Sequence, residues 1–136
     1  MYKIADLTPL DAPRYQPGVC NIGPAEIARR RMAGHVGLVV TVLGLVALAA
    51  TGAPHWLRLV LFVPAAGSAS GYLQARLHFC AGFGSRGVFN FGQLGSVEQV
   101  RDPAARARDR RRSLQISLAA VAIGVAVAVV AALLPI

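Results

Sequence analysis

The chain alternates long apolar runs with short polar segments, and three of the runs are long enough to cross a membrane. They cover residues 32–51, 56–76 and 114–134. Charged side chains are few in each run, and roughly 20 consecutive apolar residues suffice for a helix to cross the hydrocarbon core of a bilayer. The pattern predicts an all-α integral membrane protein, with a helical hairpin over 24–76 and a third transmembrane helix over 113–136.

Turn and cap signals indicate where these helices begin and bend. Pro24 and Glu26 favour a helix start, because proline suits the first helical position and a carboxylate suits the unpaired amides of the first turn. The Asp-Pro pair at 102–103 marks a second start. Pro64 removes one backbone hydrogen bond and predicts a kink in the second span. We expect Arg58 to snorkel to the outer interface.

Two segments lack a regular pattern. Residues 1–23 are interrupted by prolines but also carry apolar side chains, so we expect an extended cytoplasmic arm that is held by a partner. Residues 77–112 combine a loop rich in glycine and phenylalanine with a basic helix, and we expect the loop to lie on or dip into the membrane interface. The glycines follow no phosphate-binding pattern, so no nucleotide site is predicted.

The composition excludes an ordinary soluble enzyme. Hydrophobic residues make up 55% of the 136 positions and charged residues only 15%, whereas the formal net charge is +8. Soluble domains carry about 25% charged residues. The basic residues lie beside the apolar runs, which favours anionic lipids over nucleic acid as their counter-charge. The side chains expected at lipid headgroups are Arg29, Arg30, Arg31, Arg110, Arg111 and Arg112.

The distribution of arginines also predicts an orientation. The N-terminal flank and the segment 76–112 hold nearly all of the positive charge, and the turn at 52–55 holds none. The positive-inside rule therefore places the N-terminus and this segment inside, and the turn and the C-terminus outside. The first twenty residues contain no apolar run of the kind a signal peptide needs, so we expect no cleavage there.

Small residues recur at intervals that suit helix packing in membranes. Two glycines four residues apart in the second span and a stripe of small residues in the third predict close helix contacts, although such spacing also arises by chance in alanine-rich sequence. The residues expected at these contacts are Gly67, Gly71, Ala120, Gly124 and Ala128.

Cysteine and histidine are the residues with candidate site chemistry. Cys20, Cys80 and His78 fall on the predicted cytoplasmic side and form a candidate metal or redox site, but without a Cys-x-x-Cys motif the alternative is two unreacted thiols. His35 is a candidate ligand for a haem or a chlorophyll-type pigment, and the alternative is a hydrogen bond to a neighbouring helix or a headgroup. We predict no cofactor of the chain's own, so such a pigment enters only as a neighbour.

One further motif lies within approximately residues 20–85 and consists of Asn21, Gly23, Glu26, Arg30, Gly34, Phe79 and Cys80. In this motif the chain resembles a family of small bacterial inner-membrane domains of unknown function, which also occur fused to membrane-bound rhodaneses. The family usually has a second arginine where this chain has Ile27. The resemblance implies a two-helix hairpin in the bacterial cytoplasmic membrane and an association with sulfur transfer, and it carries over no catalytic residue.

The sequence thus predicts a binding or structural role. No pair of carboxylates, serine elbow or metal-ligand motif is apparent, so we predict no enzyme activity. We expect an accessory subunit that packs against larger integral membrane subunits, with respiratory or photosynthetic electron-transport assemblies as the expected hosts. The alternative is a small membrane redox, sulfur-handling or metal-handling protein that uses Cys20 and Cys80.

Overall fold

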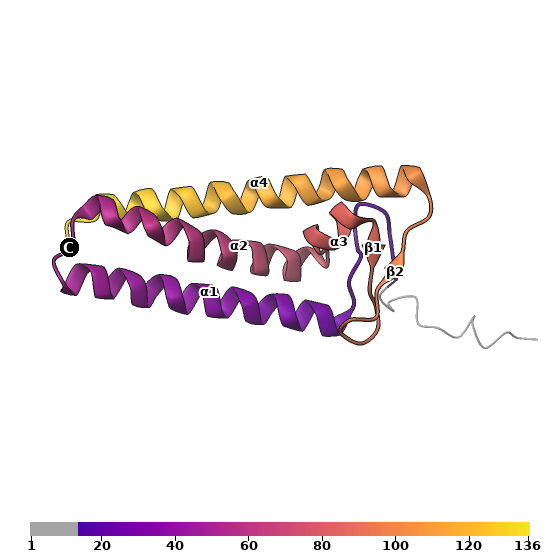
Figure 1. Ribbon diagram of the computed structural model, residues 1–136, viewed down its shortest axis with the longest axis horizontal. Helices are drawn as coiled ribbons and strands as arrows, with labels where there is room; N and C mark the ends of the chain where they lie inside the picture. The colour runs from indigo at the N-terminus through magenta and orange to yellow at the C-terminus, as the bar shows by residue number, and fades with distance from the viewer. Residues whose placement is uncertain (1–13) are drawn as a thin grey trace, which may run out of the picture.

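The computed structural model describes residues 14–136 and is mostly helical. Three helical segments lie side by side in one layer, with the middle segment in contact with both outer ones (Figure 1). A short helix and a two-stranded antiparallel ribbon close one end of the layer, and the C-terminus lies at the other end (Figure 1). The elements are α1 (Pro24–Ala50), η2 (His55–Leu61), α2 (Phe62–Leu77), α3 (Ala81–Arg86), β1 (Val88–Phe89), β2 (Glu98–Gln99) and α4 (Pro103–Leu133).

Helices α1 and α4 begin at the predicted signals. Pro24 is the first residue of α1 and Glu26 lies in its first turn, while Asp102 caps α4 by accepting a hydrogen bond from the amide of Ala104 at 3.2 Å. With 27 and 31 residues, α1 and α4 are both long and apolar enough to cross a membrane. The coarse prediction of apolar, membrane-length helices is therefore confirmed for these two.

The predicted span 56–76 is not one regular helix. It starts as the 3₁₀-helix η2 and changes to the α-helix α2 at Phe62, two residues before Pro64. Pro64 has no amide hydrogen, so it sits without cost in the first turn of α2, where the amides have no partner within the helix. The 16 residues of α2 alone are fewer than the roughly 20 that a crossing needs.

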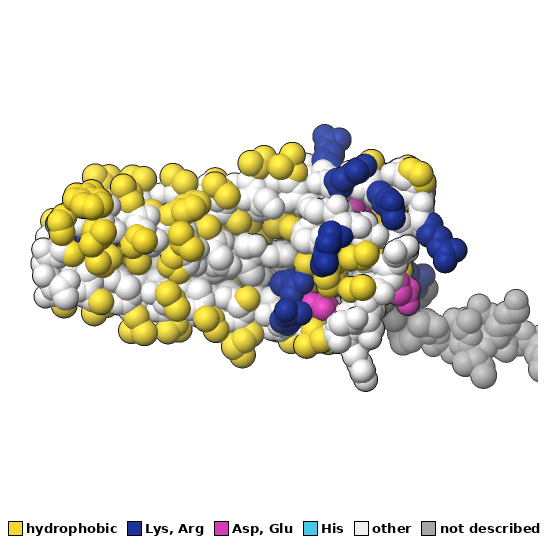
Figure 2. Space-filling view, viewed as in Figure 1, with side chains coloured by type: hydrophobic (Ala, Val, Ile, Leu, Met, Phe, Trp, Pro, Cys, Tyr) yellow, Lys and Arg dark blue, Asp and Glu magenta, His cyan; other side chains and the backbone are white. Residues whose placement is uncertain are grey.

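Charge and apolar surface are separated along the layer. Figure 2 shows arginine side chains gathered at the end that carries the short helix and the ribbon, and hydrophobic side chains over the remainder of this face. Large apolar residues are exposed on both outer helices, for example Val39 and Leu43 on α1 and Leu118 and Val130 on α4. We call the arginine-rich end the basic end and the other end the apolar end.

Glycines bring α1 and α2 into close contact. A Cβ added to Gly71 would lie 2.6 Å from the amide nitrogen of Gly34, and one added to Gly37 would lie 2.8 Å from Ser68. The Ser68 hydroxyl uses this proximity to donate a hydrogen bond of 2.8 Å to the carbonyl of Gly34. Helices approach this closely only where side chains are absent. The small-residue spacing did not predict a packing role for Gly34 or Gly37, and Gly34 entered only through the family resemblance.

The contact between α2 and α4 uses the predicted small-residue stripe. Ala120, Gly124 and Ala128 are all buried, and a Cβ on Gly124 would lie 2.7 Å from that of Ala66. Gly67 is different, because it is exposed and, apart from its chain neighbours and the backbone of its own helix, no atom lies within 4 Å of the position of its missing Cβ. Within the described chain Gly67 packs against no other helix, because α2 turns it away from both neighbours, so its expected role in helix packing stays a prediction.

Arg58 contradicts the expectation that it snorkels to an interface. Its side chain is 1% exposed and reaches the end of α4, where Nη1 donates to the carbonyls of Ala131 at 3.0 Å and Leu134 at 3.1 Å, and Nη2 donates to that of Ile136. The last carbonyls of a helix lack partners and carry partial negative charge. Because α4 has no basic residue in its last turn, Arg58 of η2 supplies the missing cation.

Candidate functional site

A buried polar cluster joins three separate segments at the basic end. We call it the polar junction, and it consists of Asn21, Glu26, Arg30, Cys80 and Asn90. Asn21 pairs with the backbone of Cys80 in both directions, since its Oδ1 accepts from the amide at 2.6 Å and its Nδ2 donates to the carbonyl at 3.1 Å. Asn21 and Asn90 are both fully buried. Such groups stay buried only when they are hydrogen-bonded, so the junction holds these segments in one arrangement.

The acidic and basic members of the junction lie one turn apart on α1. Glu26 is 1% exposed, and its Oε2 lies 3.1 Å from Nη1 of Arg30. Its other oxygen, Oε1, accepts a hydrogen bond of 3.3 Å from Asn90 Nδ2. Asn90 also exchanges backbone hydrogen bonds with Asn21 and Gly23, at 3.0 and 2.8 Å. Sequence reasoning missed Asn90, because an asparagine in a glycine-rich loop has no periodic signal.

Cys80 Sγ accepts hydrogen bonds from two donors. Nη2 of Arg30 lies 2.8 Å from Sγ, and the amide of Phe83 lies 3.4 Å from it, so Cys80 caps the first turn of α3. Cys80 is 4% exposed and packs with Ile22 and Phe83. The sulfur is therefore placed to accept hydrogen bonds, but little of it meets solvent.

The other members of the candidate thiol and metal site do not join Cys80 in a ligand set. Cys20 is a free thiol whose Sγ lies 3.8 Å from the carbonyl of Ile22, and burial raises its pKa. His78 is exposed, and its left-handed backbone ends α2. Within residues 14–136, no group of three or more His, Cys, Asp or Glu side chains is arranged to hold a metal ion. The candidate metal site of Cys20, Cys80 and His78 is thus not assembled in the part of the chain described.

His35 is bonded to a neighbouring helix. Its Nδ1 lies 2.6 Å from the Tyr72 hydroxyl of α2, and the two rings meet edge to face with centroids 5.3 Å apart. His35 is exposed in spite of this contact. A hydrogen bond to a neighbouring helix was the alternative to a haem or pigment ligand, and His35 has this arrangement.

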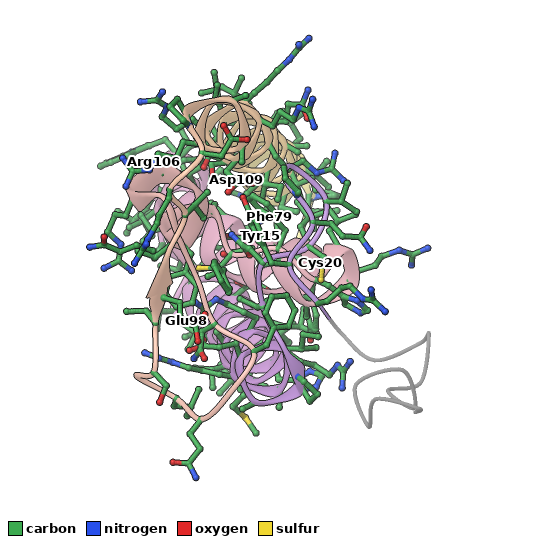
Figure 3. All side chains as sticks on the ribbon, turned by 90° about the vertical axis from the view of Figure 1, so that its right-hand side faces the viewer. Tyr15, Cys20, Phe79, Glu98, Arg106 and Asp109 are labelled. Atoms are coloured by element: carbon green, nitrogen blue, oxygen red, sulfur yellow. The ribbon has the colours of Figure 1, made fainter. Side chains whose placement is uncertain are left out.

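The segment before α1 is held by the chain itself, at a buried carboxylate of α4. Asp109 is fully buried, and its oxygens accept hydrogen bonds from the Tyr15 hydroxyl at 2.6 Å and from the Gly18 amide at 2.7 Å. Tyr15 also stacks on Phe89 with ring centroids 4.7 Å apart. Figure 3 shows Tyr15 and Asp109 close together at this end of the molecule.

The arm was expected to be held by a partner. Its residues 15–22 are held by other parts of the same chain. The part of the predicted arm that covers residues 1–13 lies outside the described residues. Asp109 was also missed, although it is the only acidic residue between Pro103 and Leu133. The available signal in the sequence was a single acidic residue within a run of arginines, which could have indicated a buried carboxylate with a specific contact.

The arginines expected at lipid headgroups differ in their exposure. Arg29, Arg31, Arg110 and Arg111 are exposed, Arg112 is half-buried, and Arg30 turns inward to Glu26 and Cys80.

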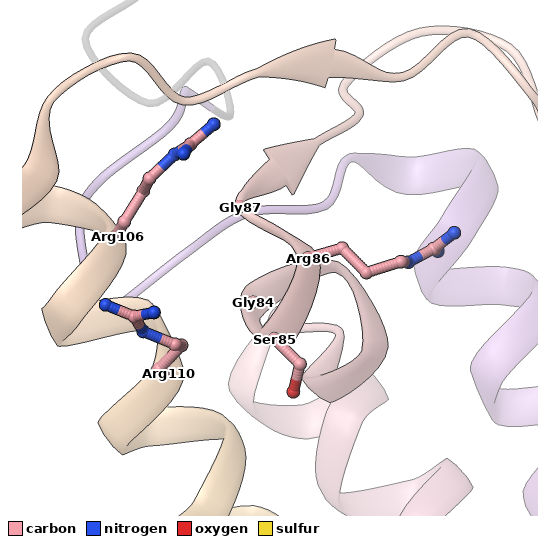
Figure 4. Close-up of a pocket in the computed structure, with 6 residues that line it drawn as sticks. All are labelled: Gly84, Ser85, Arg86, Gly87, Arg106 and Arg110. Atoms are coloured by element: carbon pink, nitrogen blue, oxygen red, sulfur yellow. The ribbon is translucent and has the colours of Figure 1, made fainter.

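Arg106 and Arg110 of α4 line a small basic pocket beside Gly84–Gly87, with a volume of about 60 Å³ (Figure 4). Arg106 Nε donates to the Val100 carbonyl at 2.6 Å, so this pocket is tied to the loop before α4.

The residues on which the family resemblance rests are close together in space. Six of the seven lie in or beside the polar junction: Asn21, Gly23, Glu26, Arg30, Phe79 and Cys80. A Cβ on Gly23 would lie 2.8 Å from the backbone of Phe91, and Phe79 is fully buried. Gly34, the seventh, packs against Tyr72 in the helix contact described above. Each of these positions thus has a packing or hydrogen-bonding reason for its residue type.

Comparison with known proteins adds no relative, since no family model, no curated protein and no solved structure matches the chain.

Proposed function

We propose that the protein is a three-pass protein of the bacterial cytoplasmic membrane that acts as a non-catalytic accessory subunit of a larger membrane complex. The observation that carries the proposal is the uncovered glycine face of α2. Gly71 is in contact with α1, whereas Gly67 lies one turn earlier at the surface with no neighbour. One half of the Gly-x-x-x-Gly pair therefore serves the chain itself, and the other half is available to a helix of another protein.

Exposed apolar side chains alone would not support a protein partner. Lipid tails solvate leucine and valine as well as another helix does, so the apolar surfaces of α1 and α4 are satisfied by the bilayer. Close backbone approach is what favours association between helices in lipid, and it needs a position without a side chain. Gly67, with exposed Val63 one turn before it, offers such a position on a helix whose two flanks are already occupied.

The length of the middle pass supports a third crossing. A 3₁₀-helix rises about 2.0 Å per residue and an α-helix about 1.5 Å, so η2 and α2 together extend about 38 Å, close to the roughly 40 Å of α1. Both lengths exceed the hydrocarbon core of about 30 Å. The basic end then lies at the cytoplasmic headgroups, where its exposed arginines bind anionic lipids.

Site-specific crosslinking in cells tests the subunit proposal. A photoreactive amino acid at Val63, which is 67% exposed on the Gly67 side of α2, should give a discrete crosslinked protein. The matched control is the same amino acid at Val46 of α1, which is 58% exposed and should give crosslinks to lipid only. Purification in mild detergent should recover the same partner with the chain.

A substitution at Gly67 distinguishes specific binding of a partner helix from nonspecific association. Gly67→Leu adds a side chain where no atom of the chain stands, so the chain should fold as before while the crosslink and the co-purified partner are lost. Recovery of the wild-type chain alone, as a monomer in mild detergent, contradicts the proposal. An equal pattern of crosslinks at Val63 and Val46 contradicts it as well.

A thiol function is the second proposal, and the contact between Arg30 and Cys80 favours it. Nη2 of Arg30 donates a hydrogen bond of 2.8 Å to the Cys80 sulfur, and an arginine beside a cysteine is typical of thiols that react with sulfur donors and oxidants. The two proposals differ in a Cys80→Ser variant. The accessory role predicts normal assembly and no lost activity, whereas the thiol role predicts normal assembly with loss of sulfur or redox transfer.

A further inference from the structure

The layer has a second uncovered face, opposite Gly67, and on this face an apolar groove runs between α1 and α4 over α2. The part of the groove nearer the basic end has a volume of about 210 Å³. Small side chains of α2 form its floor, and larger side chains of the outer helices form its walls. The lining includes Leu38, Thr41, Ala65, Ala69, Ile123 and Val127.

The groove continues in both directions along the helices. Toward the apolar end, Val127 also lines a second apolar hollow of about 300 Å³, between Leu45 of α1 and Val130 of α4. Toward the basic end, Tyr72 lines both the groove and an opening of about 330 Å³ that is bordered by Arg31 and Arg76. Along α1, Arg31 and Leu45 are fourteen residues apart, or about 21 Å at the rise of an α-helix.

This arrangement has the form of a single elongated site with an apolar body and a cationic mouth. Arg31 and Arg76 are both exposed, and neither forms an ion pair with another residue of the part described. They come from different helices, α1 and α2, which the glycine contact at Gly34 and Gly71 holds together. Half of the hydrocarbon core is about 15 Å deep, so the groove accommodates one leaflet's length of chain.

We propose that the groove binds one acyl chain of an anionic phospholipid whose phosphate lies between Arg31 and Arg76. Charge complementarity selects this occupant over a transmembrane helix, since the mouth offers two guanidinium groups at the depth of the lipid headgroups. The groove floor also favours it, because alanines at positions 65 and 69 leave a channel that a flexible hydrocarbon chain fills without needing a matched helix surface. The bound lipid would add an apolar filling between α1 and α4.

Lipid retention by the purified full chain tests this site. The chain is purified in a neutral detergent, supplied with dioleoyl phosphatidylglycerol or dioleoyl phosphatidylcholine, and examined by native mass spectrometry. One phosphatidylglycerol molecule should remain bound, and it should outcompete phosphatidylcholine. Arg31→Gln with Arg76→Gln should lower retention about tenfold, as expected for loss of charge-assisted hydrogen bonds. The matched control, Arg101→Gln with Arg108→Gln at two exposed positions that line neither the groove nor its mouth, should change it by less than about twofold.

Filling the groove tests the acyl-chain half of the proposal. Ala69→Leu should lower retention about tenfold with both mouth arginines in place. Because Ala69 is buried and a larger side chain there can unfold the chain, a second variant is needed. Leu38→Trp fills the groove from a wall residue that is 48% exposed and should act in the same way.

Several results would overturn the proposal. Equal retention of the two lipids, or an equal loss in the control pair, would show general surface attraction only. Unchanged retention in the groove-filling variants, or full displacement by inorganic phosphate, would show a headgroup or free-phosphate site without an acyl groove. Loss of a co-purified protein in Leu38→Trp, with lipid retention unchanged, would assign the groove to a helix. None of these results depends on the glycine face at Gly67, so the subunit proposal is tested separately.

Discussion

At the scale of single residues, the contact between Tyr15 and Asp109 decides where the segment before α1 lies. The phenol donates to a carboxylate that is fully buried, and Gly18 donates to the other oxygen of the same group. Burial, then the hydrogen bond to Asp109, and then the negative charges of Asp109 and Asp102 raise the pKa of Tyr15 well above its ordinary value. Each of these effects disfavours the phenolate in the folded protein.

This pKa shift gives the contact a defined pH dependence. Because the folded pKa is raised, the stabilisation is fully present below the unfolded pKa of about 10 and is lost as the pH rises through the folded pKa. The absorbance of the Tyr15 phenolate is the part of the signal that is lost in Tyr15→Phe. We expect this absorbance to titrate with a midpoint above about pH 10. Asp109→Asn should move that midpoint down, and the control Asp102→Asn should move it less. A wild-type midpoint near the ordinary value would contradict the buried contact.

At the scale of elements, the capping of α4 by Arg58 is a long-range substitute for a local signal. The guanidinium of η2 neutralises carbonyls that no side chain of α4 reaches. Arg58→Met keeps much of the apolar stem and leaves these carbonyls without a donor. We expect a loss of about 3 kcal/mol in the free energy of unfolding in detergent, the size of a lost hydrogen-bonded charge at a buried site. Arg58→Lys should recover part of it, and a neutral result in Arg58→Met would refute the capping role.

The two glycines of α2 predict opposite effects of the same substitution. Gly71→Ala places a methyl group 2.6–2.7 Å from backbone atoms of Gly34 and Arg30, which cannot move without separating α1 from α2. We expect a loss of about 1–3 kcal/mol, typical of overpacking. Gly67→Ala meets no atom, so it should be neutral or stabilise by up to about 1 kcal/mol through helix propensity. Thermal unfolding in detergent measures both, and equal effects would contradict the described packing.

At the scale of the whole molecule, the separation of charge along the layer predicts its orientation. The segment before α1 and the loop between α2 and α4 lie at the basic end, and the turn after α1 lies with the C-terminus at the apolar end (Figure 1). Reporter fusions should therefore place residue 95 in the cytoplasm, and residue 54 and the C-terminus outside. A cytoplasmic C-terminus would contradict the three-pass arrangement.

Local patterns in the sequence determined the two long helices and the residues at which they begin. Apolar length and the Pro24 and Asp102 start signals depend only on neighbouring residues, and both long helices begin where those signals lie. The small-residue stripe of α4 was also readable, because helical spacing places Ala120, Gly124 and Ala128 on one face.

Only the tertiary structure decided what each polar residue contacts. Arg58 meets the end of α4, Asp109 meets Tyr15, and Asn21 meets Cys80, across separations of 59 to 94 residues that no local pattern encodes. The same holds for Gly67 and Gly71. The sequence shows two glycines of one Gly-x-x-x-Gly pair, and only the structure shows that α1 lies beside Gly71 and not beside Gly67. A hydrogen bond or a close approach depends on the position of the second partner, and that position is a property of the assembled layer.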